Sequence, residues 1–207
     1  KEGDLFKVET ESGESYLTKT ILITSGSGRR KLPAIGADRL EHKGLTYCAS
    51  CDGPMFADQD VIVVGGGNAA FESAAQLLAY CKSVTLINRS EKFRADEITI
   101  EKLSKNPKLR LITNVEMKAV TGERFVNGMD IVHTQDGTAE HINATGIFIE
   151  IGQIPNTDYV KGFLDLDKGN KITIDPMTQQ TSVKGVWAAG DVTNGLYHQN
   201  NIAAGDA

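Results

Sequence analysis

The pattern of apolar and polar positions predicts short strands connected by helices. Residues 5–24 alternate around a polar turn and end in the apolar run 21–23, which predicts a hairpin that leads into a buried strand. The apolar runs 61–64 and 84–87 predict two more strands, and helically spaced apolar residues lie between them. Because a helix crosses between them, these two strands are expected to be parallel, as in a βαβ unit.

The rest of the chain predicts an antiparallel extension and two boundaries. A short helix is expected over 96–104, and strands are expected at 109–112, 115–120, 125–133, 146–151, 172–174 and 186–189. Loops with glycine and proline at 25–33 and 152–157 interrupt the pattern. The fold class is therefore α/β, and the expected domains are 1–31, 32–157 and 158–207.

Composition excludes several classes of protein. The chain has 22 Lys plus Arg against 27 Asp plus Glu, a net charge of −5, which argues against nucleic acid as a partner. No apolar run approaches the ~20 residues that cross a membrane. Three cysteines are too few for a secreted disulfide framework, so a cytoplasmic location is expected. The first residue is not Met and the last residues stop inside a helical pattern, which suggests a fragment at both ends.

A glycine motif between the first strand and helix of the βαβ unit predicts dinucleotide binding. The segment Gly-Gly-Gly-Asn-Ala-Ala begins at Gly65 and fits G-x-G-x-x-A. Gly65 would allow the tight turn, Gly67 would let the backbone approach a pyrophosphate, and Ala70 would let helix and strand pack closely. The phosphate would lie on N–H groups at the helix start, near Asn68 and Ala69, and Asn68 is expected to cap the helix.

The end of the next strand carries the signal for the type of dinucleotide. An NAD site would show Asp or Glu about 20 residues after the glycines. Here Asn88 is followed by Arg89, and Arg94 lies close behind. The two guanidinium groups would attract a 2′-phosphate, which favours NADPH over NADH. The alternative is that they are solvated surface arginines.

Cys48 and Cys51 form a single C-x-x-C motif that Asp52 follows. A zinc site would need a second cysteine pair, and Cys81 stands alone, so no metal site is expected. The pair is either redox-active, with Asp52 as the acid that protonates a departing thiolate, or two inert buried cysteines. The redox interpretation is favoured. Further on, Asp191 ends an apolar strand, either as a turn residue or as an acceptor for the hydroxyl groups of a cofactor.

In their order along the chain, these motifs resemble those of the low-molecular-weight thioredoxin reductases, a family of flavoprotein disulfide reductases. The corresponding segments are 23–26 for the Ala-Thr-Gly stretch, 48–53 for the redox motif, 65–70 for the NADPH motif, 88–95 for the phosphate-binding segment, 152–157 for a hinge, and 188–191 for the closing FAD motif. The resemblance implies a Rossmann-like three-layer NAD(P)-binding domain inserted into a partial FAD-binding domain. It covers nearly the whole chain.

The resemblance also implies a mechanism. NADPH would reduce FAD, FAD would reduce the Cys48–Cys51 disulfide, and the dithiol would reduce thioredoxin or a thioredoxin-like protein disulfide. Cys51 would face the flavin as the charge-transfer thiolate, Cys48 would attack the disulfide of the partner protein, and Asp52 would act as the acid-base group. The parent protein would be a homodimer.

The remaining cofactor residues follow from the same resemblance. They are Thr24, Gly152, Gly190, Asp191, Gln199 and Asn200. The family's N-terminal βαβ unit, which holds the FAD pyrophosphate, has no counterpart here, so we expect this chain alone to bind FAD weakly and to be inactive. Ser90 also stands where the family has a second consecutive arginine.

Two alternatives remain open. The flavoprotein component of alkyl hydroperoxide reductase shares this core, and its redox motif often continues as Cys-Asp-Gly-Pro, as residues 51–54 do here. That flavoprotein favours NADH and carries an acidic residue where Arg89 stands, so Arg89 favours a thioredoxin reductase. From a different class, the chain would be a nucleotide-binding module without turnover.

Overall fold

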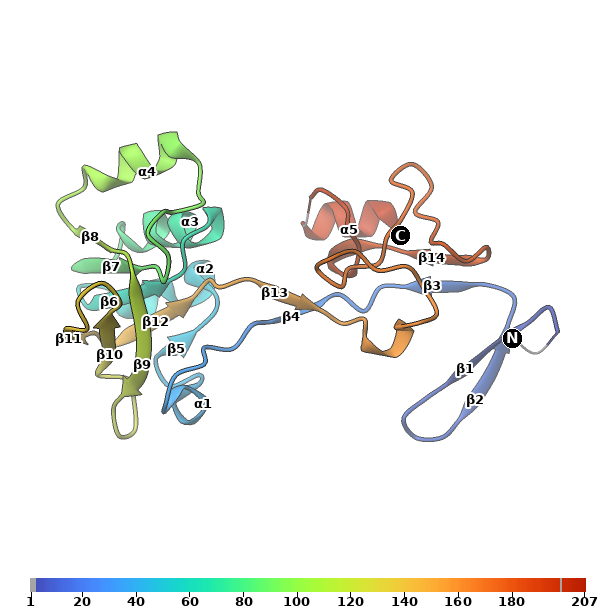
Figure 1. Cartoon of the computed structure of the whole chain (residues 1–207), viewed down its shortest axis with the longest axis horizontal. Coiled ribbons are helices and arrows are strands. Elements are labelled where there is room, and N and C mark those ends of the chain that lie inside the picture. Colours follow the sequence, from blue (N-terminus) through green and yellow to red (C-terminus); the bar gives the residue numbers. More distant parts are fainter. Residues whose placement is uncertain (1–2, 198) are drawn as a thin grey trace. The chain divides into compact units, whose positions relative to one another are not determined.

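The computed structural model describes residues 3–197 and 199–207, and the chain forms two compact units (Figure 1). The first unit is Arg30–Gly152. The second unit combines the chain up to Arg29 with the chain from Gln153 onward. The middle of the sequence is therefore inserted into a unit that both ends of the chain build.

A parallel sheet of five strands forms the centre of the first unit, in the order β5-β12-β6-β7-β8. The strands are β5 (Leu45–Thr46), β6 (Asp60–Val64), β7 (Ser83–Ile87), β8 (Leu109–Ile112) and β12 (Gly146–Ile149). All four residues of β12 are buried, and β6 and β7 are buried after their first residue. Such continuous burial is typical of parallel strands that are covered on both faces.

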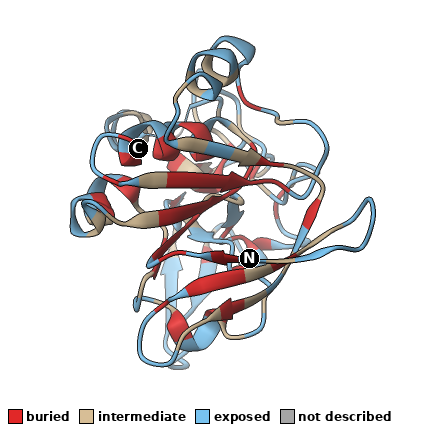
Figure 2. Ribbon diagram, turned by 90° about the vertical axis from the view of Figure 1, so that its left-hand side faces the viewer, coloured by how far each residue is buried: buried red, intermediate tan, exposed pale blue. Residues whose placement is uncertain are grey.

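Helices cover one face of this sheet. They are α2 (Ala49–Asp52), the 3-10 helix η1 (Gly53–Phe56), α3 (Asn68–Leu77) and α4 (Glu97–Ser104). The odd-numbered residues Val61 and Val63 of β6 pack in a buried cluster with Phe71 and Leu77 of α3. Helix α4, at the top of Figure 2, has no buried residue and therefore lies at the outside of this layer.

An antiparallel sheet covers the other face. It has the order β11-β10-β9, with β9 (Val115–Thr121), β10 (Gly128–His133) and β11 (Ala139–Asn143), and the short helix α1 (Ala37–Leu40) lies beside it. The even-numbered residues Ile62 and Val64 of β6 pack against Met129 and Ile131 of β10. The alternation within β6 therefore divides the core of the unit into two layers.

The second unit contains three strand pairs and a small core. The strands are β1 (Phe6–Glu9), β2 (Ser15–Thr18), β3 (Ile21–Ile23), β4 (Ser27–Arg29), β13 (Gln153–Pro155) and β14 (Val186–Ala188). β1 pairs with β2 and β4 with β13 in antiparallel fashion, whereas β3 and β14 are parallel. The helices are η2 (Asp158–Val160), η3 (Gly190–Val192) and α5 (Asn200–Asp206). Phe6, Ile23, Ile172 and Val186 are among its core residues.

The predicted α/β class, the parallel βαβ unit and the antiparallel extension are confirmed. The strand predicted at 172–174 is wrong: Ile172 is fully buried but makes only isolated bridges, so it is an apolar residue of a loop. The strand at 21–23 exists, yet Leu22 is 51% exposed. Strand β11 was missed because only one of its five residues, Ile142, is buried.

Phe148 of β12 tests the helical layer of the core. Its side chain is fully buried and stacks edge-on against Phe56 of η1, with the ring centroids 5.4 Å apart. We expect Phe148→Ala to lower the free energy of unfolding of the first unit by about 3–5 kcal/mol, because it leaves a cavity. Urea unfolding followed by circular dichroism measures the change. The matched control is Phe125→Ala, at a site 65% exposed, which should stay within about 0.5 kcal/mol. Equal effects of the two variants would contradict this assignment of the core.

Candidate functional site

The glycine turn between β6 and α3 is packed closely against its neighbours. Gly65 has φ +153°, and a Cβ at this position would lie 2.3 Å from the carbonyl oxygen of Glu150. A Cβ on Gly66 would lie 2.5 Å from Oδ1 of Asn88. Neither position has room for a side chain, and Gly65 also has a backbone conformation that favours glycine. These two glycines are therefore required by the fold of the turn.

Gly67 differs from its two neighbours because it faces open space. It immediately precedes α3, and no atom lies within 4 Å of where its Cβ would be. Ala70, one turn into the helix, is fully buried, whereas Ala69 is exposed. The backbone N–H groups at the start of a helix are suited to bind phosphate, and this start has free space in front of it. The turn therefore fits a dinucleotide pyrophosphate.

The predicted role of Asn68 as a helix cap is wrong. Asn68 is the first residue of α3, and Gly67 takes the capping position without a side-chain hydrogen bond. The Oδ1 atom of Asn68 instead accepts a hydrogen bond of 2.8 Å from the backbone N–H of Asp96. Asn68 therefore ties the start of α3 to the start of α4, which the capping of α4 by Asp96 places nearby.

Asn88 holds the loop after β7 against the glycine turn. Its side chain is buried, and Nδ2 donates hydrogen bonds to the backbone oxygens of Ser90 (2.9 Å) and Lys92 (3.0 Å). The backbone N–H of Arg94 donates to the oxygen of Gly66 at 2.6 Å. The loop and the turn therefore form one structure at the carboxyl edge of the sheet, where α/β proteins bind their ligands.

Arg89 and Arg94 are exposed on this loop. Within residues 3–197 and 199–207, neither guanidinium group makes a hydrogen bond or an ion pair. The structure therefore brings Asn88, Arg89 and Arg94 to the same edge as Gly65 and leaves the two positive charges available to an anion.

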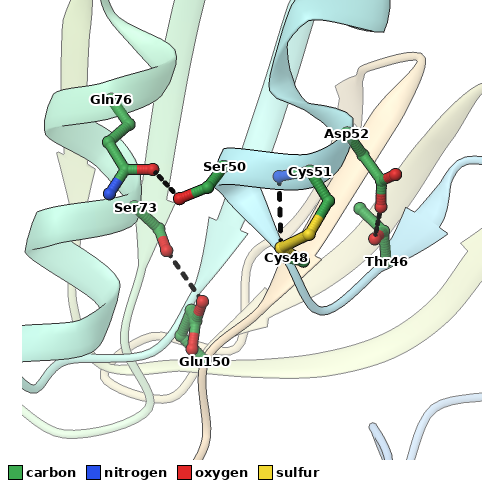
Figure 3. The surroundings of a disulfide bond; sticks show 8 residues. All are labelled: Thr46, Cys48, Ser50, Cys51, Asp52, Ser73, Gln76 and Glu150. Carbon is green, nitrogen blue, oxygen red and sulfur yellow. Dashed lines mark hydrogen bonds between the residues drawn. A yellow bond between two sulfur atoms is a disulfide. The ribbon is translucent and has the colours of Figure 1, made fainter. Parts of the chain in front are cut away.

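The C-x-x-C pair forms a disulfide at the start of α2 (Figure 3). Cys48 caps the helix, and its Sγ accepts a hydrogen bond of 3.1 Å from the backbone N–H of Cys51. Cys51 is exposed, whereas Cys48 is half-buried. Once the disulfide is reduced, the N–H group would stabilise negative charge on Cys48, so the local backbone suits a reactive thiolate.

The carboxylate of Asp52 lies on the opposite side of α2 from Ser50 in Figure 3. It accepts a hydrogen bond from the hydroxyl of Thr46, a buried residue of β5. Thr46 thus orients the group that the sequence predicts as a proton donor. The motif search missed Thr46, because nothing in its sequence position marks it before the fold is known.

Helix α3 connects the disulfide and the glycine turn. Ser50 of α2 donates a hydrogen bond of 2.7 Å to Gln76 of α3, and Ser73 of α3 donates one of 2.7 Å to Oε1 of Glu150 (Figure 3). Ser73 and Gln76 are three residues apart and so lie on the same face of the helix. Glu150 also forms the back of the turn at Gly65. Sequence reasoning missed Glu150 and Ser73, since neither belongs to a recognised motif.

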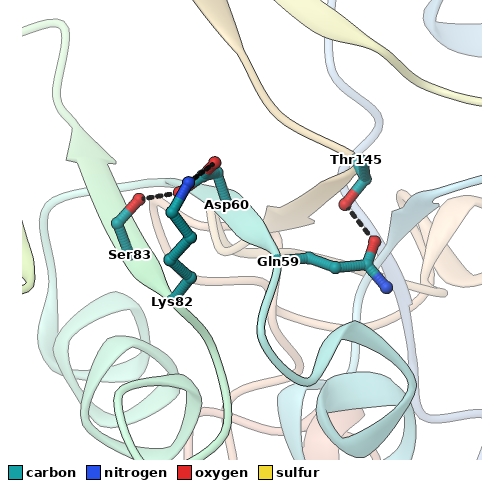
Figure 4. A network of polar contacts seen from close by, with 5 residues as sticks. All are labelled: Gln59, Asp60, Lys82, Ser83 and Thr145. Carbon is teal, nitrogen blue, oxygen red and sulfur yellow. Dashed lines mark hydrogen bonds and ion pairs between the residues drawn. The ribbon is translucent and has the colours of Figure 1, made fainter.

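A polar network fixes the chain that leads from the redox helix into the sheet (Figure 4). Gln59 donates a hydrogen bond to the oxygen of Met55 and accepts one from Thr145. Asp60 accepts hydrogen bonds from Ser83 and Lys82, and these two contacts, that of Ser83 first, lower the pKa of the Asp60 carboxyl. The segment after the disulfide is therefore attached at the amino-terminal edge of the sheet.

The second unit carries the residues predicted to bind FAD. Thr24 follows β3, and Gly190 and Asp191 follow β14, so all three stand at the carboxyl ends of a parallel strand pair. Gln199 and Asn200 are exposed at the start of α5, which packs on η3. Gly152, in the first unit, has φ +96° and is exposed. The cofactor roles of these residues stay predictions.

Metal and membrane sites were also sought in the part of the chain that the structure describes. No group of three or more His, Cys, Asp and Glu side chains is arranged there to hold a metal ion. No helix in the same part is both long enough and apolar enough to cross a membrane.

The sequence pattern of the pyridine nucleotide-disulphide oxidoreductases matches residues 1–207. The chain belongs to this family. Two curated members are 37% and 36% identical to it: thioredoxin reductase of Streptomyces clavuligerus, over 98% of this chain and 63% of that protein, and the F component of alkyl hydroperoxide reductase of Staphylococcus aureus, over 99% and 40%. The chain thus spans 40% to 63% of the length of these family members.

Solved structures of the family agree. The crystal structure of Lactococcus lactis thioredoxin reductase, in the FR conformation, is 31% identical and gives a TM-score of 0.84 over 100% of this chain and 68% of that one. The resemblance to thioredoxin reductases and the predicted fold class are thereby confirmed. At the coarser level, the chain is part of a disulfide oxidoreductase of a family that uses a flavin and a nicotinamide cofactor.

Two glycine variants separate folding from binding in this family member. We expect Gly65→Ala to lower the stability of the first unit by about 1–3 kcal/mol, because alanine is strained at this backbone angle and clashes with Glu150. Gly67→Ala should change stability by less than about 0.5 kcal/mol, yet weaken dinucleotide binding, because the methyl group enters the space in front of α3. Thermal unfolding and titration with NADPH measure the two effects. Unimpaired binding by Gly67→Ala would contradict the assigned pyrophosphate site.

The three cysteines should differ in reactivity. Burial raises the pKa of the Cys81 thiol, with an opposing contribution from Lys108, and the side chain is fully buried. After mild reduction of the folded chain, we expect a thiol reagent to label Cys48 and Cys51 rapidly and to label Cys81 only on unfolding. The control variant Cys81→Ala should keep the fast pair and lose the slow thiol. Rapid labelling of all three thiols in the folded protein would refute this assignment.

Proposed function

We propose that the chain belongs to an NADPH-dependent flavoprotein disulfide reductase that reduces thioredoxin or a thioredoxin-like protein. The overall reaction would convert NADPH, a proton and a protein disulfide into NADP⁺ and a protein dithiol. The observation that carries this proposal is that one compact unit holds both a C-x-x-C disulfide and a glycine turn suited to a dinucleotide, connected by α3. The known thioredoxin reductases among its relatives support it.

In the nucleotide half of the site, each residue would have a distinct task. The start of α3 at Gly67, Asn68 and Ala69 would bind the pyrophosphate through backbone N–H groups. Arg89 and Arg94 would bind the 2′-phosphate that distinguishes NADPH from NADH. Their exposure and their lack of a guanidinium partner among the described residues support this role.

In the redox half, the chain would hold two thiols in different surroundings. When bound, FAD would supply the transfer of two electrons from NADPH to the Cys48–Cys51 disulfide. Cys48, whose sulfur receives the N–H of Cys51, would attack the disulfide of the partner protein, and Cys51 would then close the ring again and release the partner as a dithiol. Asp52, oriented by Thr46, would give a proton to the departing thiolate.

The flavin would contact residues of the second unit. Thr24, Gly190 and Asp191 at the ends of β3 and β14 have the position that an α/β ligand site needs, and Asp191 would accept hydrogen bonds from hydroxyl groups of the cofactor. Gly190 has φ +77° and lies against Ala203 of α5, which supports a close approach of backbone there. Gln199 and Asn200 at the start of α5 would lie beside the flavin ring, and Gly152 would serve as a hinge.

The setting of the protein is proposed on weaker grounds. Three cysteines suit a reducing cytoplasm, and the family resemblance favours a homodimer. A second candidate function is the NADH-dependent flavoprotein of an alkyl hydroperoxide reductase, which the relative from Staphylococcus aureus favours. Arg89, where that flavoprotein carries an acidic residue, argues for the first candidate.

The visible absorption spectrum of the full-length protein tests the proposal. We expect a flavin spectrum that NADPH bleaches under anaerobic conditions at lower concentration than NADH, followed by reduction of added thioredoxin. Arg89→Ala should weaken NADPH binding about ten-fold or more while leaving NADH binding unchanged, because a charge-assisted contact to the 2′-phosphate is lost. Arg124→Ala, an exposed arginine of the β9–β10 turn, is the control and should have no effect.

Other results would favour a different function. Bleaching mainly by NADH, with no effect of Arg89→Ala, would favour the alkyl hydroperoxide reductase flavoprotein. A colourless protein that binds NADPH would refute both enzymes and leave a nucleotide-binding module. Cys48→Ser should keep the bleaching by NADPH and abolish reduction of thioredoxin.

A further inference from the structure

The order of strands predicts where the second half of a dinucleotide would lie. The glycine turn follows β6, and the loop with Arg89 follows β7, its neighbour on one side. A dinucleotide lies across the carboxyl ends of the strands with its pyrophosphate at the glycine turn. If the adenosine half extends over β7, the nicotinamide half extends the other way, over the end of β12. The residue that follows β12 is Glu150.

Glu150 is held firmly against the glycine turn. Its backbone N–H donates a hydrogen bond of 2.8 Å to the oxygen of Val64, the last residue of β6. Its carbonyl oxygen lies 2.3 Å from where a Cβ of Gly65 would be. The backbone of Glu150 therefore forms one wall of the turn that the pyrophosphate would occupy, which places its side chain at the start of the nicotinamide side.

The carboxylate of Glu150 is oriented by α3. Its Oε1 accepts a hydrogen bond of 2.7 Å from Ser73, whose side chain belongs to a residue that is only 6% exposed (Figure 3). A carboxylate has about four acceptor positions, so a group that accepts from Ser73 can also accept from a ligand. The negative charge is thus fixed in direction beside the proposed nucleotide site.

The chemistry of the nicotinamide end matches such a group. Its carboxamide carries two N–H donors, and its ring is neutral in NADPH and positively charged in NADP⁺. We propose that the Glu150 carboxylate, positioned by Ser73, accepts a hydrogen bond from the nicotinamide carboxamide and favours the binding of NADP⁺ over that of NADPH. This inference rests on the proposed function, because it needs the dinucleotide at the glycine turn.

Binding measurements on the full chain separate the two halves of the ligand. The ligands are NADPH, NADP⁺ and 2′,5′-ADP, which contains the adenosine and both of its phosphates but no nicotinamide. We expect Glu150→Gln to leave the Kd of 2′,5′-ADP unchanged and to weaken NADP⁺ more than NADPH, because glutamine still accepts a hydrogen bond but lacks the charge. Glu150→Ala should weaken NADPH and NADP⁺ about ten-fold, as expected for the loss of a hydrogen bond to a charged group.

Ser73→Ala and an exposed acidic residue complete the design. Ser73→Ala should shift the two dinucleotide affinities in the same direction as Glu150→Ala, by a smaller factor, because the carboxylate is kept but no longer oriented. Glu101→Gln on α4 removes a charge with 72% exposure and should change none of the three affinities. Thermal unfolding of each variant checks that the fold is retained.

The outcomes distinguish this inference from the proposed function. If the wild-type chain binds 2′,5′-ADP and Glu150→Ala changes no dinucleotide affinity, the inference is wrong and the dinucleotide site stands. A parallel loss of all three affinities in Glu150→Ala would assign Glu150 a purely structural role and also overturn the inference. If the wild-type chain binds none of the ligands, the proposed function fails together with the inference.

Discussion

The contact between the backbone of Glu150 and Gly65 is the constraint on which the site depends. It brings the end of β12 so close to the turn after β6 that only glycine fits, and the sharp turn in turn points the start of α3 toward open space. The buried Asn88 side chain applies the same constraint from the other side, at Gly66. Gly67, between this packed turn and the helix, keeps its freedom. A ligand site is thus formed where close packing of the sheet ends.

The same constraint explains why redox and nucleotide chemistry share one unit. The helix that begins at the turn carries Ser73 and Gln76 on one face, and these residues contact Glu150 and the redox helix respectively. The burial of Phe71 and Leu77 in the core fixes this helix on the sheet. The distance between the two chemical groups is therefore set by a rigid element rather than by a loop, which suits a reaction that needs repeatable geometry.

Local patterns predicted the parts of the structure that depend on local patterns. The strands β6 and β7, the helix between them and the glycine motif were found because burial on both faces leaves continuous apolar runs. Residues 172–174 were misassigned because an apolar loop in a core has the same composition as a strand, and β11 was missed because it is almost entirely exposed. Glu150, Ser73 and Thr46 could not be found, because their roles arise from contacts that only the folded chain creates.

The first unit also begins and ends at the same place. The backbone N–H of Arg30 donates a hydrogen bond of 3.1 Å to the oxygen of Gly152, so the two chain ends of this 30–152 unit are neighbours. An inserted module whose ends meet adds little strain to its host and can be exchanged as a cassette. Evolution could therefore vary the cofactor preference and the redox motif of this module independently of the unit that surrounds it.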